Sequence, residues 1–372
     1  MNKFLLFTRT PWDEPPRARH QVAEALSSKG IVYFIEANKF GFPKIEIKKE
    51  SENLYLITPF FPISYKVRFR LMVFNELFQY WLIKALKIKI KNITSSVLVN
   101  FDHTAYVIIK RLNLFSIYYC NDDHIRTHNI PVPFLTNYFN YCEKQVAQYS
   151  NFTVGTSIPL QKKLLKYNKC SYLIKLGAPS LGFSPMFHQH SNNKIRVALI
   201  GFISTNRIPI NVLFEILEDE KMELNVFGSI SDFLYDKLKH FKNFVYHGIK
   251  TGNDLYRIVN TMDIGIAPYN IEDVNIGGTP NKLWIYLALG KPVVVTELNA
   301  IKNWTFREKF VYKSKNNLNF KYLIQLAYSE DNKTLFELRV KYAEENSWRN
   351  RINELIKYIQ QNKTDATTNP TA

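Results

Sequence analysis

Long apolar runs and cysteine pairs are both missing from this sequence. No run approaches the roughly 18 apolar residues of a membrane-spanning helix. Near the start, the only apolar stretch is Phe4–Phe7, which is too short for the core of a signal peptide and fits a buried strand better. The three cysteines, Cys120, Cys142 and Cys170, form no C-x-x-C pair, so neither a disulfide framework nor a zinc ribbon is supported. A reducing cytoplasm is therefore the expected location.

Several phosphate-binding and catalytic motifs are also absent. The sequence contains no G-x-G-x-x-G, no Walker A motif and no G-x-S-x-G. These absences argue against a dinucleotide-dependent oxidoreductase, a P-loop NTPase and an α/β hydrolase. His188 and His190 lie in a polar stretch without a third ligand at a suitable spacing, so no metal site is expected there.

Basic residues, in contrast, are abundant and unevenly distributed. The chain carries 49 Lys+Arg against 32 Asp+Glu, a formal net charge of +17, and residues 1–190 hold 25 of the basic and 12 of the acidic residues. Within Tyr65–Lys91, basic and aromatic residues alternate along a predicted helix. This pattern indicates either contact with an anionic membrane surface or a core-facing helix with a solvated basic face. The lysines expected to contact the membrane are Lys84, Lys87, Lys89 and Lys91. Nucleic acid is not favoured, because no RRM or KH signature is present.

Short apolar runs alternate with helical patterns along the whole chain. In the first half, the predicted strands are Lys3–Thr8, Ile31–Glu36, Leu54–Thr58, Ser96–Phe101, Ser116–Cys120, Phe152–Thr156 and Tyr172–Leu176. In the second half they are Ile195–Gly201, Leu224–Gly228, Asn243–His247, Asp263–Pro268 and Pro292–Thr296. Nearly continuous apolar strands separated by helices predict parallel sheets covered on both faces. The predicted fold class is therefore α/β, with two doubly wound Rossmann-like domains facing a central cleft, where ligands would bind beyond the carboxyl ends of the strands.

A polar, turn-rich break near residue 180 separates the two sets of strands. It predicts an N-terminal domain at residues 1–180, a linker at 181–193 and a C-terminal domain at 194–347. A helix at 348–361 is expected to close the fold, and the polar tail 362–372 is expected to be disordered. In the first domain, the pattern of Tyr65–Ile90 predicts one long helix.

The segment Asn275–Thr296 is the most informative part of the chain. A Gly-Gly-Thr turn precedes Pro280, which suits the first turn of a following helix. Backbone amides at such a helix N-terminus attract phosphate, and Lys282 would add a full charge towards the same anion. The alternative is a plain helix–turn–strand unit, which explains the later Gly290 but accounts less well for the Gly-Gly-Thr-Pro-Asn-Lys sequence.

This segment resembles the nucleotide-sugar glycosyltransferases of GT-B fold, whose second domain carries a pattern close to P-x-K-L-x-E-Y-L-A-x-G-K-P-V-V. The matching residues are Pro280, Lys282, Leu283, Tyr286, Leu287, Ala288, Gly290, Lys291, Pro292, Val293 and Val294. Further segments resemble the same family in the same order, namely Val197–Ile203, Val226–Gly228, Tyr246–Gly248, Met262–Tyr269 and Ser347–Trp348. Pro11–Glu14 and Arg17–Gln21 resemble the opening loop of bacterial enzymes that build teichuronic acid, exopolysaccharide and similar surface glycans.

The resemblance implies a donor site in the second domain. Lys282 and the amides of Gly278 and Thr279 would hold the donor diphosphate and offset the charge that develops as the sugar–phosphate bond breaks. Arg207 would add a second cation, with a plain surface arginine as the alternative. The implied donor-binding residues are Gly201, Asn206, Arg207, Gly228, Tyr269, Gly278, Thr279, Asn281 and Lys282. No metal or other cofactor is expected, because Lys282 and the helix amides would replace it and no D-x-D carboxylate pair is present.

One position departs from the family pattern. Ile285 stands where many retaining members carry a glutamate, and Gly277 stands at the matching position eight residues earlier. Isoleucine cannot accept hydrogen bonds from ribose hydroxyls. The neighbouring acidic residues Glu272, Asp273 and Glu297 are the candidates to replace that glutamate. The departure favours an inverting over a retaining mechanism.

Deprotonation of an acceptor hydroxyl would need a base in the first domain. Asp122 and Asp123 follow the predicted strand Ser116–Cys120, and repulsion between adjacent carboxylates can raise the pKa of one of them. Related inverting GT-B enzymes place a base in a similar S-D-D turn, so the resemblance makes Asp122 the first candidate, ahead of Asp123 and Asp102. The alternative is a solvated aspartate pair at a helix start. His20 is a further catalytic candidate, with an ordinary histidine in the first turn of a helix as its alternative.

Together these patterns predict a metal-independent hexosyltransferase. It would move a sugar from a nucleotide-sugar, with a UDP-sugar as the expected donor, to a growing cell-surface polysaccharide or lipid-linked acceptor. The expected location is cytoplasmic and peripheral at the inner face of the plasma membrane. Two other functions remain open at this stage, a GT-B nucleotide-sugar epimerase and a non-catalytic GT-B subunit of a polysaccharide-synthesis complex.

Overall fold

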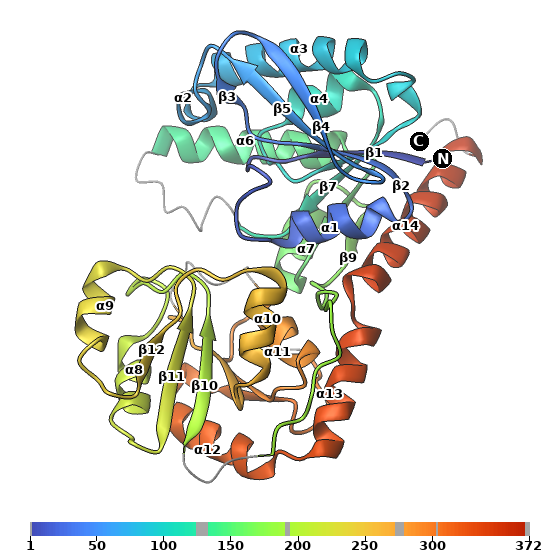
Figure 1. Cartoon of the computed structure of the whole chain (residues 1–372). Helices are drawn as coiled ribbons and strands as arrows, with labels where there is room; N and C mark the ends of the chain where they lie inside the picture. Colours follow the sequence, from blue (N-terminus) through green and yellow to red (C-terminus); the bar gives the residue numbers. More distant parts are fainter. Residues whose placement is uncertain (1, 124–132, 190–193, 272–278, 303, 369–372) are drawn as a thin grey trace. The chain divides into compact units, whose positions relative to one another are not determined.

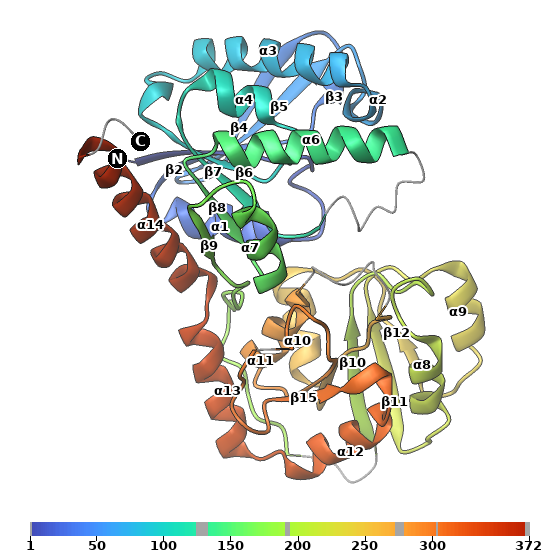
Figure 2. The same cartoon turned by 180° about the vertical axis from the view of Figure 1, so that it is seen from behind.

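The chain forms two compact units, each an α/β domain (Figures 1 and 2). The structure is a computed structural model that describes residues 2–123, 133–189, 194–271, 279–302 and 304–368. Unit 1 comprises Met1–Lys175 and Arg351–Ala372, and unit 2 comprises Leu176–Asn350. Each unit is built on one largely parallel sheet, as the apolar strand patterns predict.

The sheet of unit 1 has the strand order β3-β5-β2-β1-β6-β7-β8-β9, and β4 pairs with β5. Its strands are β1 (Asn2–Phe7), β2 (Gly30–Ile35), β3 (Lys39–Phe40), β4 (Lys44–Ser51), β5 (Leu54–Phe61), β6 (Val97–Asn100), β7 (Phe115–Cys120), β8 (Phe152–Gly155) and β9 (Ser171–Leu173). The β4–β5 pair is antiparallel and the other pairs are parallel. Because the chain moves outward from β1 in both directions, the sheet is doubly wound.

Helices cover both faces of this sheet (Figure 1). They are α1 (Ala18–Ser27), α2 (Tyr65–Arg70), α3 (Met72–Lys89), α4 (Tyr106–Leu112), α6 (Pro133–Tyr149), α7 (Ile158–Leu165) and the greater part of α14 (Trp348–Thr368), with a 3₁₀ turn at Ile93–Ser95. Helices α3, α4 and α6 contribute Phe78, Ile108 and Phe139 to one apolar core, and α1 lies on the opposite face. The strand ends that carry the candidate catalytic residues are therefore fixed between two helical layers.

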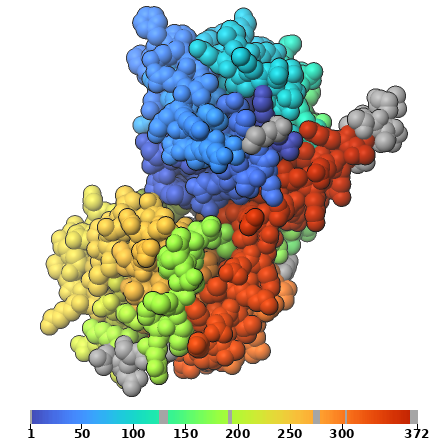
Figure 3. All heavy atoms as spheres, turned by 45° about the vertical axis from the view of Figure 1, so that its right-hand side comes forward, coloured from blue at the N-terminus to red at the C-terminus, as the bar shows by residue number. Residues whose placement is uncertain are grey.

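Helix α14 packs against unit 1, where its red atoms lie against blue atoms of the N-terminal part in Figure 3. The Tyr358 ring stacks on the Tyr172 ring with 3.9 Å between centroids, and the Asn362 side chain donates to the Tyr172 hydroxyl at 3.0 Å. The expected disorder of the tail is therefore wrong for residues 362–368, which are helical. Tertiary contacts of this kind stabilise a polar helix that composition alone does not favour.

Unit 2 has an all-parallel sheet in the order β12-β11-β10-β13-β14-β15. Its strands are β10 (Ile195–Ile200), β11 (Met222–Phe227), β12 (Phe244–Tyr246), β13 (Ile264–Ala267), β14 (Val293–Thr296) and β15 (Val311–Ser314). Its helices are α8 (Ile210–Leu217), α9 (Asp232–Leu238), α10 (Gly252–Asn260), α11 (Asn281–Ala288), α12 (Phe320–Glu330) and α13 (Lys333–Glu345), with a 3₁₀ turn at Lys315–Asn317. The predicted linker residues 181–189 belong to this unit, where the His188 ring contacts Asn260 at 3.2 Å.

The sequence patterns do not predict three of the strands or the interruption of one helix. Strands β3, β4 and β15 were not expected, because β4 is charged and exposed almost throughout while β3 and β15 are short strands near sheet edges. The expected single helix over Tyr65–Ile90 is two helices, since Leu71 has φ −120° and ψ 111°, an extended conformation. Just before this break, Arg68 turns into unit 1 and donates to Asn38 and Asn75. Within the described residues, no helix is both long and apolar enough to cross a membrane.

Candidate functional site

Two glycines mark the carboxyl ends of neighbouring strands in unit 2. Gly201 follows β10 with φ +130°, and Gly228 follows β11 with φ +122°, both in the region that favours glycine. A Cβ on Gly228 would overlap the Gly201 carbonyl oxygen, and a Cβ on Gly201 would lie 3.1 Å from the Lys282 Nζ atom. Sequence reasoning selected all three residues, and the structure brings them together at one edge of the sheet.

Lys282, in the first turn of α11, places its ammonium group at this edge. The Nζ atom lies 5.0 Å from the centroid of the Tyr269 ring. Burial, and then the charge of Arg207, lower the pKa of Lys282 to about 7. Within the described residues, the ammonium has no hydrogen bond or ion pair, so nothing in this part of the chain offsets its charge. A buried cation without a counter-charge is the arrangement expected where an anionic ligand binds.

Tyr286 holds α11 against the sheet and thereby fixes the position of Lys282. Its hydroxyl accepts the Ile200 N–H at 3.0 Å and lies 2.9 Å from the Ala198 carbonyl, to which it can donate. The Tyr286 ring occupies the space where a Cβ on Gly265 would be. The family pattern matched Tyr286 but assigned it no role, since two of its hydrogen-bond partners, Ile200 and Ala198, lie more than eighty residues earlier in the chain.

Tyr269 and Thr279 complete the described surroundings of Lys282. The Tyr269 N–H donates to the Thr296 hydroxyl at 2.8 Å, and the Asn317 side chain donates to the Tyr269 carbonyl at 2.9 Å. Thr296 and Asn317 were not selected from the sequence, because nothing in their local pattern marks them. The Thr279 hydroxyl is buried and has no hydrogen-bond partner among the described residues, so it can serve a ligand.

The remaining predicted donor-side residues lie nearby or outside the described part of the chain. Asn206 and Arg207 are exposed, and the Arg207 guanidinium lies 5.8 Å from the Phe202 ring. Asn281, the first residue of α11, is half-buried, as are Ile285 and Glu297. Gly277, Gly278, Glu272 and Asp273 lie outside the described residues. No group of three or more His, Cys, Asp or Glu side chains within the described ranges could hold a metal ion.

In unit 1, Asp122 and Asp123 follow β7, as predicted, but their environments differ. The Asp122 Oδ1 atom accepts the Asp123 N–H at 2.9 Å. The Asp123 carboxylate pairs with the Lys163 ammonium at 2.9 Å, and Lys163 also pairs with the buried Glu143 at 2.7 Å. Although burial opposes it, the charges of Glu143 and Asp123 raise the pKa of Lys163. The Lys163 ammonium thus offsets the charge of the Asp123 carboxylate.

Asp102 and His20 occupy the same carboxyl edge of the unit 1 sheet. Asp102 follows β6 and is buried, and its Oδ1 atom accepts the backbone N–H and the hydroxyl of Thr104, each at 2.8 Å. The His20 Nδ1 atom accepts the Arg17 N–H at 3.1 Å in the first turn of α1. Burial, and then the charge of Arg19, lower the pKa of His20 to about 4. His20 is therefore neutral near pH 7, and its Nδ1 atom is engaged at the start of α1.

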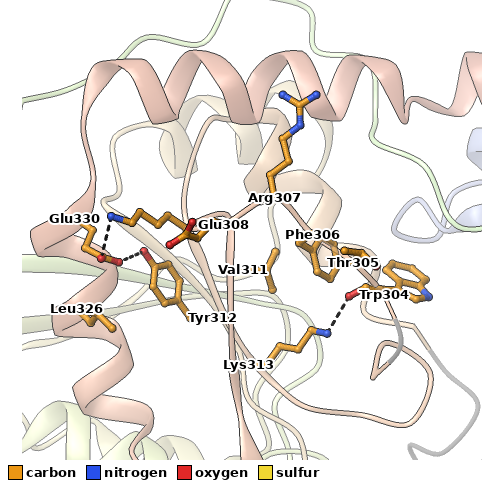
Figure 4. A pocket seen from close by; sticks show the side chains of 11 residues that line it. Trp304, Thr305, Phe306, Arg307, Glu308, Val311, Tyr312, Lys313, Leu326 and Glu330 are labelled. Carbon is orange, nitrogen blue, oxygen red and sulfur yellow. Dashed lines mark hydrogen bonds and ion pairs between the residues drawn. The ribbon is translucent and has the colours of Figure 1, made fainter.

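A separate cavity of about 510 Å³ lies along strand β15 (Figure 4). Its charged groups are largely paired, since the Lys309 ammonium contacts Glu330 at 3.2 Å and the Tyr312 hydroxyl donates to Glu330 at 2.7 Å. The Lys313 ammonium donates to the Trp304 carbonyl at 2.9 Å. None of the predicted site residues lines this cavity, and its paired charges make it a poorer anion site than the region around Lys282.

Comparison with solved structures gives matches along almost the whole chain. Sucrose-phosphate synthase from Thermosynechococcus elongatus matches with a TM-score of 0.75 and 12% identity, covering 97% of this chain and 99% of its own. The UDP-forming α,α-trehalose-phosphate synthase from Burkholderia xenovorans, in complex with glucose-6-phosphate, matches with 0.69 and 8%, covering 97% and 100%. The catalytic domain of starch synthase IV from Arabidopsis thaliana, bound to ADP and acarbose, matches with 0.67 and 10%, covering 97% and 99%.

Comparisons of the sequence with protein-family models and with curated proteins give no match. The structural matches share little sequence, so they speak for the architecture and not for the reaction. Strand order, parallel pairing and two-unit organisation agree with the expectation from the Asn275–Thr296 segment. The chain therefore has the GT-B fold, with two Rossmann-like α/β domains.

Proposed function

We propose that the protein is a glycosyltransferase that uses a nucleotide-sugar donor, with a UDP-sugar as the preferred class. The observation that carries this proposal is the Lys282 ammonium, which is partly buried beside Gly201 and Gly228 and has no counter-charge among the residues that the structure describes. The two glycines leave the strand ends open to close approach of a ligand. The presence of UDP-forming and ADP-bound enzymes among the structural matches supports a nucleoside diphosphate as the leaving group.

The reaction needs stabilisation of the departing diphosphate. When the bond between the sugar and the β-phosphate breaks, negative charge develops on the phosphate oxygens. Lys282 would meet this charge directly, and the Thr279 hydroxyl would donate a hydrogen bond to it. Because a side-chain cation can supply this stabilisation, we propose a metal-independent reaction.

The acceptor hydroxyl must lose a proton as it attacks the sugar carbon. We assign this proton to Asp122, which follows β7 in the place where related inverting GT-B enzymes carry a base, and the neighbouring Asp123 carboxylate is held by Lys163. The side chain at position 285 cannot act as a carboxylate in the donor site. The assignment of a base in unit 1 and the lack of a carboxylate at position 285 both favour inversion at the anomeric carbon.

The Asp122→Asn variant tests the proposed function and the proposed base together. Wild type and variant should bind UDP equally, with about 2.7 kcal/mol of added stability at 100 times the dissociation constant, measured as a thermal shift. Only the wild type should transfer sugar, and the rate of the variant should fall by about 10²- to 10⁴-fold. The Asp123→Asn variant is the matched control and should keep most of the activity.

Three outcomes would contradict parts of this assignment. Absence of a thermal shift at millimolar UDP would contradict a nucleotide-sugar donor. Equal transfer rates for wild type and Asp122→Asn would contradict the base. Conversion of the donor sugar without any acceptor would indicate an epimerase instead.

We further propose that the acceptor is a cell-surface polysaccharide or a lipid-linked glycan, reached at an anionic membrane surface. Helix α3 presents one outward face with exposed apolar residues in its first half and lysines with an exposed isoleucine in its second half. Its exposed apolar members are Val73, Leu77, Tyr80 and Ile88, the last 80% exposed, and Lys84 and Lys87 share their helical spacing. Apolar side chains flanked by lysines are suited to the interface of an anionic bilayer.

The turn between β3 and β4 extends this surface. Phe40 is largely exposed and Phe42 is 89% exposed, with Lys39 and Lys44 beside them. The turn begins next to α2, because the Asn38 side chain accepts a hydrogen bond from Arg68 at 2.9 Å. The β3–β4 turn was not anticipated from the sequence, since the surrounding residues lack an apolar period.

Changing Lys84, Lys87, Lys89 and Lys91 together to Gln should weaken binding to phosphatidylglycerol vesicles by at least about 100-fold, at about 1 kcal/mol for each lysine. Vesicle sedimentation at low and high salt measures the effect, which salt should suppress in the wild type. The control changes Lys237, Lys242, Lys250 and Lys315, four exposed lysines of unit 2, to Gln. Equal loss of binding in both variants would show a general charge effect and contradict a defined surface on α3.

A further inference from the structure

The side chains of Arg9, Arg19 and Arg68 are largely buried near the carboxyl edge of the unit 1 sheet. Few carboxylates are close enough to offset their charges. Arg19 is paired with Glu14, its Nε atom donating at 3.1 Å. The Arg9 Nε atom lies 3.8 Å from the Asp102 carboxylate. Arg68 donates to the neutral side chains of Asn38 and Asn75, and the carboxylate that acts most strongly on its charge is again Asp102. One carboxylate therefore serves two buried guanidinium groups.

The neighbouring carboxylate Glu36 does not supply the missing charge. Its two oxygens accept hydrogen bonds from the Trp12 N–H and from the Thr58 hydroxyl. It is also not among the charges that act most on Arg19, Tyr65 or Arg68. The region around Asp102 thus holds an excess of positive charge among the described residues. Burial of an incompletely paired charge is costly unless a ligand offsets it.

Arg9 and Tyr65 keep hydrogen-bond donors unused in this region. The Arg9 side chain is only 11% exposed, yet its guanidinium makes no hydrogen bond within the described residues. It lies 4.9 Å from the Phe69 ring, which the Tyr65 ring contacts at 5.7 Å. The Tyr65 hydroxyl likewise has no hydrogen-bond partner in the described part of the chain. Both side chains thus flank Phe69 with donors available to a ligand.

We infer that unit 1 holds the acceptor through an oxyanion, a phosphate or a carboxylate, bound by Arg9 and Tyr65. This inference rests on the proposed transferase function and names the chemical class of its acceptor. The planar guanidinium presents parallel N–H groups that match two oxygens of either anion, and the phenol adds a third donor. Arg68 lies behind them, with its Cζ atom 5.3 Å from the Tyr65 ring, and favours negative charge at the same place.

The test uses the Lys282→Met variant, in which the proposed donor site can no longer attract phosphate. Inorganic phosphate and glucuronate are titrated separately by calorimetry, to distinguish a phosphate-bearing from a carboxylate-bearing acceptor. Saturable binding of at least one anion is expected. Adding Arg9→Gln should weaken it by at least about 10-fold, and Tyr65→Phe should weaken it by a few fold. Arg111→Gln, which removes an exposed arginine of α4, should leave binding unchanged.

Each result decides the inference. Failure of both anions to bind, or binding that Arg9→Gln leaves unchanged, would overturn it. Should Arg9→Gln fold poorly by circular dichroism, Arg9→Lys keeps the charge but loses the paired N–H groups and should show intermediate affinity. UDP binding to the wild type is measured in parallel. Its absence would contradict the donor assignment alone, while UDP binding without Arg9-dependent anion binding would overturn the acceptor assignment alone.

Discussion

Replacing Lys282 by methionine is expected to weaken UDP binding by about 10- to 100-fold, because a charge-assisted hydrogen bond to phosphate is lost. The same change should make the ligand-free protein more stable. Burial lowers the pKa of Lys282 to about 7, so near neutral pH the folded protein confines a partly protonated amine that it does not stabilise. Methionine fills a similar volume without that charge. UDP titration and thermal unfolding of both proteins measure the two opposite effects.

Both the stability of the protein and its affinity for UDP should depend on pH through the protonation of Lys282. Between the folded pKa of about 7 and the ordinary lysine pKa of 10.5, the unfolded chain binds a proton that the folded chain lacks. The stability contributed by Lys282 therefore rises with pH across this window, and it is lost as pH falls through about 7. The advantage of Lys282→Met should be largest at pH 6 and fade towards pH 10. UDP affinity of the wild type should fall above pH 7, since binding an anion then requires uptake of a proton.

Lys291→Met is the matched control for this experiment. Lys291 is also buried, and burial lowers its pKa to about 8, but it lies beyond the other end of α11, just before β14. Its replacement should leave UDP affinity unchanged. If both variants lost UDP binding equally, the effect would come from general damage to unit 2. If neither variant did, Lys282 would not contact the donor.

A methyl group on Gly228 should cost about 2–6 kcal/mol of unfolding free energy, from strained backbone at about 1–3 kcal/mol and from overpacking at about 1–3 kcal/mol. Gly228 has φ +122°, and its Cβ would overlap the Gly201 carbonyl oxygen. Because Gly201 also borders the Lys282 Nζ atom, any shift that relieves this overlap moves the strand end beside Lys282. Gly228→Ala should therefore lose both stability and UDP binding, measured by denaturant unfolding and by UDP titration.

Gly248→Ala separates the two contributions to that loss. Gly248 also has positive φ, at +70°, but a Cβ there meets nothing within 4 Å. Only the backbone cost of about 1–2 kcal/mol should remain, with UDP binding intact. Equal losses in the two alanine variants would mean that the close approach between Gly228 and Gly201 has no effect on stability.

The parts of the fold that sequence reasoning predicts are those with a strong local pattern. The central strands of both sheets are almost wholly buried, so their apolar runs stand out. Strand β4 escapes notice because it is charged and pairs only with β5. The helical state of residues 362–368 depends on contacts with β9, near residue 172, which no local pattern reveals.

In the candidate site, too, the residues with a local sequence pattern could be predicted, whereas the contacts between distant residues could not. Lys282 and the two strand-end glycines each lie in a recognisable local sequence pattern, so the sequence alone selects them as candidates. The pairing of Asp123 with Lys163, the anchoring of α11 by Tyr286 and the shared use of Asp102 by two arginines were not predicted, since each joins residues that are far apart in the chain. Long-range electrostatics of this kind exists only after folding, so it becomes visible only in the structure.

The division of α14 between the two units has a topological consequence. Unit 2 is one uninterrupted segment, Leu176–Asn350, inserted into a host domain made of two segments. Cutting the chain once, after Lys175, leaves unit 1 without the helix that stacks Tyr358 on Tyr172. A self-contained unit 1 would instead require a direct graft of Lys175 onto Arg351, two residues close enough for the charge of Arg351, after burial, to lower the pKa of Lys175. Unit 2 is therefore an insertion into unit 1 rather than the second member of a tandem pair, and it is the unit that can be removed as one continuous segment.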